Sequence, residues 1–430
     1  MESAPAEHRA VDAVWRIESP RIIARLAALY RDIDLAEEVA QEALLAALEE
    51  WPGSGVPENP GAWLLGAAKH RAIDVIRRRK MAAKKSDEIA RAIEETESAT
   101  PDIEERLDDA VGDDLLRLVF VACHPVLSRE AQVALTLRML GGLTTVEIAR
   151  AFLVPEPTIA QRIVRAKKTL AEKNVPFEVP HASELETRLA AVLEVLYLIF
   201  NEGYAATAGD DWMRPALCDD ALRLGRIVAE LVPGEPEVHG LVALMELQAS
   251  RIPARVDAKG DPVLLLAQDR TRWDHVLISR GVAALERGNA LVDPTRASGK
   301  SDAAIIGPYL LQARIAACHA RARTPNDTDW AQIAALYAAL MAMAPSPIVE
   351  LNRAVAVGMA FGPAAGLAIV DALADDPTLS DYHLFPSVRA DLLAKLGRMD
   401  EARAELERAA ALTTNTRERA LLLARAATCR

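Results

Sequence analysis

Apolar residues recur at steps of three and four along most of the chain, which is the period of an amphipathic α-helix. Between residues 34 and 51, Ala40, Leu44, Leu48 and Trp51 follow one another at steps of four, four and three. Short stretches rich in Pro and Gly, such as PGSGVPENPG, interrupt these runs and indicate turns. The pattern predicts an all-α protein.

The length of the chain indicates several domains. Its 430 residues exceed what a single hydrophobic core usually holds, so two or three domains are expected. The helical pattern divides into a first small domain at 12–85, a linker at 86–112, a second small domain at 113–176 and a large helical domain at 183–430.

The distribution of charge along the chain is more informative than the total charge. The net charge of −12 argues against a nucleic-acid binder. Residues 69–85, however, hold eight Lys and Arg against one acid, whereas 86–114 hold twelve Asp and Glu against two Arg. A basic helix therefore precedes an acidic linker, and this local charge matters more than the total.

The helix predicted at about 61–80 has two different faces. Leu65, Ala68, Ala72, Val75 and Ile76 share one face when the helix is turned by 100° per residue. The opposite face carries Trp63, His70, Arg71, Asp74, Arg77 and Arg78. An aromatic ring among cations suits phosphate neutralisation and base stacking. A solvated, Arg-rich helix end with Trp63 in the core is the alternative, and the residues alone leave both open.

The segment LTTVEIARAFLVPEPTIAQRIVRAKKTL, residues 143–170, predicts a helix-turn-helix. In its second helix, Ile159, Ile163, Ala166 and Leu170 form the core stripe. The opposite face carries Thr158, Gln161, Arg162, Arg165 and Thr169, with Lys168 beside it. Such a face can enter a DNA major groove. Leu153 stands where such turns usually have Gly, and a helix pair without DNA contact is the alternative.

The long C-terminal part repeats a helix, a turn and a second helix. Arg353 and Arg389 lie 36 residues apart, and Ala365 and Ala402 lie 37 apart. This period resembles that of tetratricopeptide (TPR) repeats, with 415–430 as a capping helix. Further upstream, LAQDRTRWDHVLISRG at 266–281 places Arg and Asp residues around a Trp, either as an interaction surface or as a buried ion-pair cluster.

Several classes of protein are disfavoured. The polar, acidic N-terminus is no signal peptide, and no apolar run has transmembrane length, so a cytoplasmic protein is expected. The four cysteines lie far apart, which predicts free thiols. Phosphate-binding loops, HExxH, GxSxG and metal-spaced clusters do not occur. We expect no enzyme activity, cofactor or metal.

The order of these features resembles the sigma-70 class of bacterial transcription initiation factors. DLAEEVAQEALLAALEEW resembles region 2.2, PGAWLLGAAKHRAIDVIRRRK resembles regions 2.3 and 2.4, and the helix-turn-helix resembles region 4.2. The short two-domain form is typical of extracytoplasmic-function sigma factors. The long helical tail is similar to that of the group with a C-terminal TPR-like extension.

The resemblance implies partners and roles. The partners are promoter DNA and core RNA polymerase, contacted at its β′ clamp and β flap. Polymerase contacts are expected from Glu38, Gln41 and Glu42. Contacts to the −10 element are expected from Trp63, His70, Arg71, Arg77 and Arg78. Contacts to the −35 element are expected from Thr158, Gln161, Arg162 and Arg165, with Lys167 and Lys168 near phosphate. The acidic linker would follow the RNA-exit path, and the tail would modulate activity.

A different class of protein also fits part of the sequence. A helix-turn-helix activator with a repeat-type interaction domain would bind duplex DNA without polymerase. It leaves the helices at 34–85 and the acidic linker unexplained. The two hypotheses differ in whether the purified chain binds promoter DNA alone or only with core polymerase.

Overall fold

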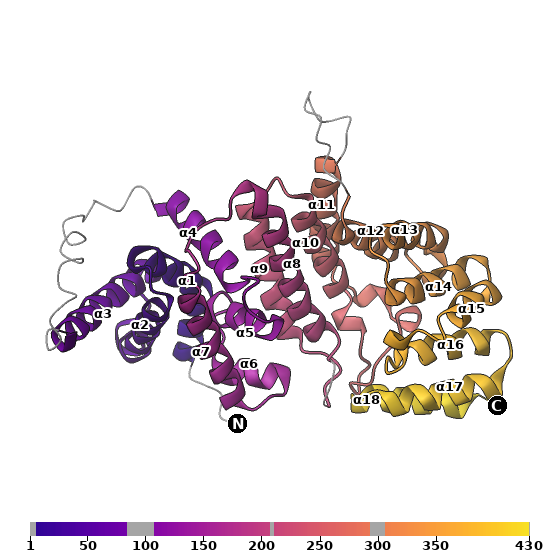
Figure 1. Ribbon diagram of the computed structural model, residues 1–430. Helices are drawn as coiled ribbons and strands as arrows, with labels where there is room; N and C mark the ends of the chain where they lie inside the picture. Colours follow the sequence, from indigo (N-terminus) through magenta and orange to yellow (C-terminus); the bar gives the residue numbers. More distant parts are fainter. Residues whose placement is uncertain (1–5, 84–106, 207–209, 293–305, 430) are drawn as a thin grey trace. The chain divides into compact units, whose positions relative to one another are not determined.

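The structure, a computed structural model, describes residues 6–83, 107–206, 210–292 and 306–429. Within these ranges the chain forms eighteen α-helices, several short 3-10 helices and an isolated bridge between Val256 and Pro262 (Figure 1). The predicted all-α class is confirmed. The chain divides into two compact units, Met1–Val195 and Leu196–Arg430.

The first three helices of unit 1 are α1 (Ala6–Tyr30), α2 (Ile33–Ser54) and α3 (Pro60–Ala83). They bury one apolar core, whose larger members are Ile22, Ile23, Leu26, Val39, Trp51 and Leu64. Asp32 caps α2, because its side chain accepts a hydrogen bond from the backbone N–H of Leu35 at 2.9 Å. Leu44 and Leu48, expected in the core, are half-buried.

The next four helices are α4 (Leu107–Ala122), α5 (Arg129–Met139), α6 (Thr145–Phe152) and α7 (Glu156–Glu172). Ser128 caps α5, because its side chain accepts a hydrogen bond from the Ala131 backbone N–H. Gly142 ends the segment after α5 with φ +70°, and a Cβ there would lie 2.9 Å from Ser19 Oγ on α1. The predicted acidic linker lies outside the described residues up to 106, and from Leu107 onward the chain is already helical.

Leu153 occupies the turn between α6 and α7 in a left-handed conformation, with φ 53° and ψ 39°. That conformation costs a residue with a Cβ about 1–2 kcal/mol, which is why glycine is common at such turns. Leu153 is 52% exposed, so its side chain points toward solvent and does not have to fit between α6 and α7. The backbone N–H groups of Leu153 and Val154 still bond to carbonyls of α6. The turn therefore forms without the usual glycine.

Helix α8 (Ala182–Tyr204) begins in unit 1 and ends in unit 2. In unit 2 it is followed by α9 (Pro215–Leu231), α10 (Pro236–Ala249), α11 (His275–Val292) and α12 (Pro308–Arg321). Helices α10, α11 and α12 share a core that includes Leu244, Leu285 and Leu310. Gly240 allows the close contact of α10 with α12, because a Cβ there would lie 2.6 Å from the Leu310 backbone nitrogen.

The rest of unit 2 consists of α13 (Trp330–Met343), α14 (Pro347–Phe361), α15 (Pro363–Ala372), α16 (Leu384–Lys395), α17 (Met399–Leu412) and α18 (Thr416–Thr428). The pair α14–α15 recurs as α16–α17, and the starts of matching helices lie 37 and 36 residues apart in the sequence. Successive helices lie side by side in Figure 1. Asn415, at the start of α18, donates to the carbonyls of Ala206 and Asp211 and so ties the end of unit 2 to its beginning.

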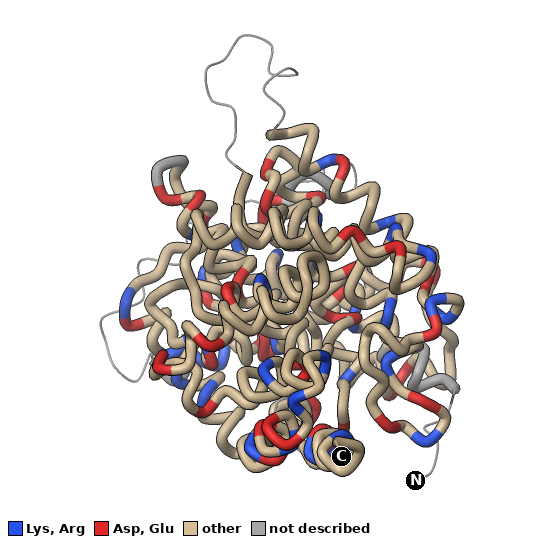
Figure 2. The backbone as a smooth tube through the Cα atoms, turned by 90° about the vertical axis from the view of Figure 1, so that its right-hand side faces the viewer, with Lys and Arg blue, Asp and Glu red and all other residues tan. Residues whose placement is uncertain are grey.

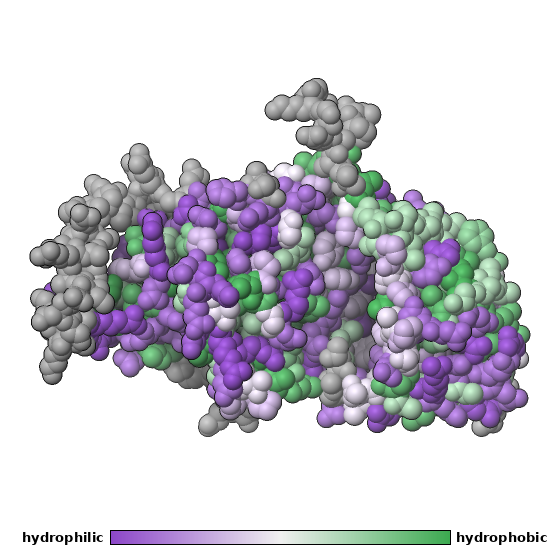
Figure 3. All heavy atoms as spheres, viewed as in Figure 1, coloured by the Kyte–Doolittle hydropathy of each residue, from purple (hydrophilic) through white to green (hydrophobic). Residues whose placement is uncertain are grey.

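The surface of unit 2 is uneven in polarity. Figure 3 shows hydrophobic colour over the region of α13 and α14, where Met343 and Ile348 are 42% and 43% exposed. Figure 2 shows basic and acidic positions interleaved around the C-terminus. Between α16 and α17, Arg389 pairs with Glu405 at 2.8 Å. Among the described helices, none combines the length and the apolar character needed to cross a bilayer.

Candidate nucleic-acid interface

The two helices of the predicted helix-turn-helix are fixed by local contacts. Thr144 Oγ1 accepts from the Glu147 backbone N–H at 3.2 Å, and Glu147 Oε2 accepts from the Thr144 N–H at 2.8 Å. This capping box starts α6. On α7 the predicted stripe Ile159, Ile163, Ala166 and Leu170 is at most 5% exposed. Burial of this stripe turns the opposite face of α7 outward.

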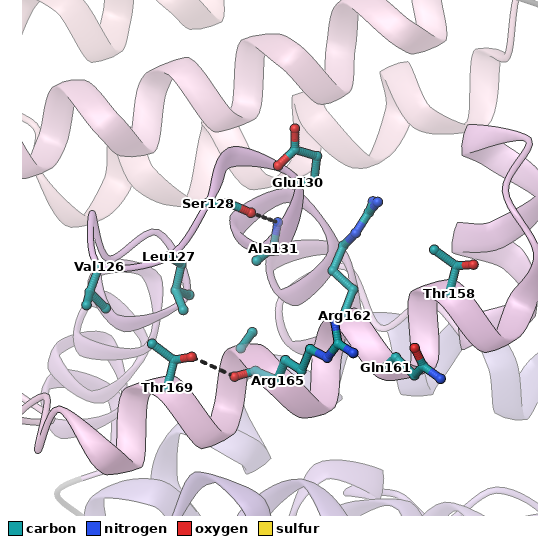
Figure 4. Close-up of a pocket in the computed structure, with 11 residues that line it drawn as sticks. Val126, Leu127, Ser128, Glu130, Ala131, Thr158, Gln161, Arg162, Arg165 and Thr169 are labelled. Atoms are coloured by element: carbon teal, nitrogen blue, oxygen red, sulfur yellow. Dashed lines mark hydrogen bonds between the residues drawn. The ribbon is translucent and has the colours of Figure 1, made fainter.

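The outward face of α7 holds most of the residues predicted for the −35 element. Thr158, Gln161, Arg165 and Lys168 are exposed, and Arg162 is half-buried. Figure 4 shows Thr158, Gln161, Arg162 and Arg165 on one side of α7, facing the start of α5. They line a hollow of about 440 Å³ together with residues that precede and begin α5, namely Val126, Leu127, Ser128, Glu130 and Ala131. The structure thus brings two arginines, an amide and a hydroxyl to one surface.

Lys167 lies elsewhere on α7. Its Nζ is 2.6 Å from Asp34 Oδ1 and 2.8 Å from Glu37 Oε2, and its side chain is 15% exposed. It therefore faces α2 rather than the hollow. A phosphate contact by Lys167 remains a prediction, and at the outward face of α7 it would require the side chain to turn away from α2.

Glu37 is the centre of this contact. It is 6% exposed, and besides Lys167 it accepts from Arg138 Nε at 2.6 Å and from Gln41 Nε2 at 2.9 Å. We call Asp34, Glu37, Arg138 and Lys167 the Glu37 cluster. It joins α2 to α5 and α7. Two further ion pairs, Arg25–Asp114 at 3.1 Å and Arg16–Glu147 at 3.0 Å, link α1 to the second group of helices.

The sequence interpretation missed the Glu37 cluster, although one signal for it exists. Glu37 lies three residues before Ala40 and seven before Leu44, so it falls on the apolar stripe of its helix. A carboxylate on a buried stripe needs a cationic or hydrogen-bonding partner. The pattern could therefore have indicated a buried ion pair, but not its partners.

The charges of the Glu37 cluster shift its own titration. Burial raises the pKa of Glu37, but the charges of Lys167 and Arg138 and their hydrogen bonds outweigh it, so the pKa lies below the ordinary 4.5. Burial lowers the pKa of Lys167, but Glu37 and Asp34 outweigh it, so the pKa lies above 10.5. Both side chains are therefore charged at neutral pH.

These directions predict how stability depends on pH. Because the pKa of Glu37 is depressed in the folded protein, its ionised carboxylate stabilises the fold above pH 4.5. This stabilisation is lost as the pH falls through the pKa of the folded state. Because the pKa of Lys167 is raised in the folded protein, its ammonium group stabilises the fold below pH 10.5. This stabilisation is lost as the pH rises through the pKa of the folded state. The difference in urea midpoint between wild type and Glu37→Gln should be constant around neutrality and shrink in acid. A difference that grows as the pH falls below 4.5 would contradict the assignment.

Helix α3 presents the residues predicted for the −10 element. His70, Arg71, Arg77 and Arg78 are exposed, and Trp63 is half-buried. The Trp63 ring lies edge-on against the buried Trp51, with centroids 5.3 Å apart. Trp63 is therefore partly a core residue and partly accessible, so it combines features of both alternatives.

The residues predicted to contact polymerase lie on the neighbouring helix α2. Glu38 is exposed and pairs with Arg79 at 3.4 Å, while Glu42 pairs with Arg71 at 3.7 Å. Gln41 is half-buried and bonds to Glu37. The predicted polymerase residues of α2 and the basic side of α3 thus meet along one edge of the first helical group.

The four cysteines are free and buried. Burial raises the pKa of Cys123 to about 11 and that of Cys218 to about 12. The predicted free thiols are confirmed, and these two stay protonated at neutral pH. Within the described ranges, no three His, Cys, Asp or Glu side chains gather as metal ligands would.

Comparisons with known proteins agree with this geometry. Residues 15–81 match the family model "Sigma-70 region 2", and residues 117–170 match "Sigma-70, region 4". Residues 188–289 match a "Family of unknown function (DUF6596)". An uncharacterized protein, R00370 of Rhizobium meliloti (strain 1021), is 44% identical over 405 residues, covering 94% of this chain and 92% of the relative. No solved structure matches.

The two groups of helices in unit 1 therefore define a helix-turn-helix protein of transcription initiation. The chain belongs to the sigma-70 family and is an RNA polymerase sigma factor, with regions 2 and 4 followed by a helical C-terminal domain. Its partners are core RNA polymerase and promoter DNA.

Proposed function

We propose that this sigma factor is of the extracytoplasmic-function type and that its C-terminal domain is TPR-like and modulates its activity. The observation that carries the proposal is the arrangement in unit 1, where α3 and α7 each bury an apolar stripe and turn a basic face outward. The order of region 2, acidic segment, region 4 and helical tail supports the short two-domain form. The 36- and 37-residue spacing of helix pairs supports the TPR-like tail.

In this proposal the residues of α3 hold the −10 strand and those of α7 read the −35 element. Unstacking and extruding bases costs a few kcal/mol. Stacking on Trp63 and pairing of phosphates with Arg71, Arg77 and Arg78 would offset that cost. The hydrogen-bonding groups of Gln161, Arg162 and Arg165 can reach base edges in a major groove. The proposal assigns no catalytic role to any residue of the chain.

The proposal is tested by run-off transcription from the DNA upstream of the protein's own gene. Core polymerase with the full chain should initiate at one start site, and core polymerase alone should not. The competing hypothesis of a polymerase-independent activator predicts a footprint on this DNA from the purified chain alone. Such a footprint, together with no initiation by core polymerase, would favour the activator.

Replacing Arg77 and Arg78 by Ala should impair open-complex formation more than binding to core polymerase. Both side chains are exposed, so folding should survive, and each lost phosphate contact should reduce the salt dependence of DNA binding. Permanganate reactivity of the melted strand measures opening. The matched control is the double variant Arg280→Ala and Arg287→Ala on α11, which removes two exposed arginines from unit 2. Equal loss of polymerase binding and strand opening would argue against the assignment.

Removing the C-terminal domain should change promoter activity several-fold, which corresponds to a coupling of about 1–3 kcal/mol. The structure favours a cut after Val195 rather than near residue 182. Arg188 Nη2 donates to the Phe120 carbonyl at 2.8 Å and Glu194 pairs with Arg129, so the first half of α8 packs within unit 1.

Run-off transcription over a titration of polymerase measures this effect. Higher activity of the shortened chain would mean that the tail inhibits, and lower activity would mean that it helps polymerase docking. Equal activity at every polymerase concentration would show that the tail is not an intrinsic regulator.

A further inference from the structure

The segment that joins α10 to α11 carries three arginines that the sigma-factor function does not use. Figure 1 shows this segment, residues 250–274, lying between α10 and α11 on one side and α14 to α17 on the other. It is held there by Arg417 of α18, which donates to the Gly260 carbonyl at 2.8 Å, and by Arg270, which reaches the end of α12. Arg251, Arg255 and Arg270 thereby come together inside unit 2.

Arg255 is the most deeply buried of the three, with 6% exposure. Its guanidinium carbon lies 3.6 Å from the centre of the Tyr204 ring and 5.6 Å from that of Trp212. The guanidinium therefore lies over the face of the Tyr204 ring. Among the described residues no carboxylate pairs with Arg255, and its Nη1 is buried without a hydrogen-bond partner.

Arg251 links Arg255 to the rest of the group. Its guanidinium carbon lies 5.7 Å from the Tyr204 ring that Arg255 also covers, and its Nε is buried without a partner in the described structure. Burial and then the charge of Arg251 lower the pKa of Arg270. Burial, followed by the charges of Arg251 and Arg270, lowers the pKa of His319 to about 4. His319 is therefore neutral at pH 7, so it neither adds to nor balances the positive charge of the arginines.

Arg270 has a structural role. It donates to the carbonyls of His319 and Ala322 at 2.7 Å each and to Thr328 Oγ1 at 3.2 Å. Its guanidinium carbon lies 4.7 Å from the Trp273 ring. Among the described residues, Arg270 is thus held by carbonyl and hydroxyl oxygens rather than by an ion-pair cluster, while an interaction surface at 266–281 stays a prediction. Arg270 fixes the segment and leaves Arg251 and Arg255 to face the interior.

The contrast with other arginines of unit 2 shows what is unusual here. Arg226 pairs with the buried Glu246 at 2.8 Å, Arg353 with Glu350 at 2.6 Å, and Arg389 with Asp371 and Glu405. Positive charges inside proteins are normally neutralised in this way. Arg251 and Arg255 share one aromatic ring instead, and each repels the other.

Most of the unpartnered polar atoms of this group are hydrogen-bond donors; His319 Nδ1, also buried without a partner in the described structure, donates or accepts according to its tautomer. On the three arginines and the two tryptophans beside them, the buried atoms without partners are Arg251 Nε, Arg255 Nη1, Arg270 Nε, Trp212 Nε1 and Trp273 Nε1. All five are N–H donors. A group that accepts several hydrogen bonds and carries negative charge satisfies such a set, and guanidinium groups bind oxyanions in this manner.

We propose that Arg251 and Arg255, with Tyr204 and Trp212, form a binding site in the C-terminal domain for an oxyanion group of a small molecule, either a phosphate or a carboxylate. We call this the Arg255 site. Tyr204, Trp212, Arg251 and His319 are half-buried, so each of these side chains has a part exposed to solvent. A ligand at the Arg255 site would bind unit 2 independently of promoter recognition.

The test measures the thermal midpoint of the full chain with inorganic phosphate or with succinate, each compared with chloride at the same pH and ionic strength. A rise with phosphate identifies phosphate as the group recognised, and a rise with succinate identifies carboxylate. Isothermal titration gives the Kd of the effective probe. No rise with either probe above that in chloride would overturn the proposal.

Variants assign the binding to this site. Arg255→Gln and Arg251→Gln should each raise the Kd of the probe that binds wild type by about tenfold or more, since each substitution removes charged hydrogen bonds. Arg287→Gln, which removes an exposed arginine of α11, should bind as wild type does. Equal affinity of wild type and both site variants would place the binding elsewhere and overturn the proposal.

A second measurement separates a ligand site from a structural role of Arg255. Without probe, Arg255→Gln should have a thermal midpoint equal to or above that of wild type, because it removes a buried charge that lacks a counter-ion. A role in holding Tyr204 and Trp212 in place predicts the opposite, a lower midpoint. A lower midpoint together with unchanged probe binding in Arg251→Gln would show that the arginines are structural.

Discussion

Replacing Glu37 by Gln should lower the free energy of unfolding of unit 1 by about 2–3 kcal/mol. Breaking a fully buried ion pair on one side costs about 3–5 kcal/mol, because the remaining charge stays buried without its partner. Here Arg138 and Lys167 are 16% and 15% exposed, and Lys167 keeps Asp34, so the cost should be somewhat smaller. Hydrogen exchange should accelerate in α2 and α7, where the contact is lost.

The neighbouring variant Glu38→Gln provides the matched control. Glu38 has the same chemistry one position along α2, but its side chain is 51% exposed and its pair with Arg79 lies on the surface. Exposed pairs contribute about 0–1 kcal/mol, so this variant should unfold nearly as wild type does. Equal effects of the two substitutions would mean that the Glu37 cluster does not hold the two helical groups together.

Replacing both Arg162 and Arg165 by Ala should reduce transcription from a −35-dependent promoter by about a hundredfold. A good contact between a side chain and a base contributes about 1–3 kcal/mol, and two such losses multiply in the binding constant. The buried stripe of α7 is untouched, so the fold should persist. Run-off transcription at increasing concentrations of the chain measures the loss.

The control for this prediction is the template rather than the protein. On a promoter whose −35 sequence has been replaced, wild type and the double variant should transcribe at similar low levels. A hundredfold difference on that template as well would show that the arginines act on folding or on polymerase binding. Full activity of the variant on the intact promoter would remove α7 from DNA recognition.

The sequence could predict those parts of unit 1 that depend on near neighbours. The stripe Ile159, Ile163, Ala166 and Leu170 follows from the helical period alone, and the caps at Ser128 and Thr144 follow from side chains within three residues. The outward face of α7 is then determined by geometry, because it is what remains when the stripe is buried.

Contacts between distant residues could not be predicted in the same way. Glu37 and Lys167 lie 130 residues apart, and a helical pattern contains no information on which two helices meet. Lys167 was accordingly predicted near phosphate, whereas the structure places it against α2. Arg251 and Arg255 share a ring with Tyr204 only because the segment at 250–274 folds back into unit 2. Their meeting depends on tertiary structure.

The position of Lys167 has a thermodynamic consequence. Its side chain points toward α2 and is 15% exposed, so the ammonium group has to turn away from Glu37 to reach a DNA phosphate at the outward face of α7, and these two positions compete. If Lys167 binds phosphate, the Glu37 cluster lowers the affinity for DNA by some factor. Because linkage is reciprocal, bound DNA lowers the equilibrium constant for forming the cluster by the same factor. Promoter DNA would then weaken the contact between regions 2 and 4 by the same free energy by which that contact weakens promoter binding.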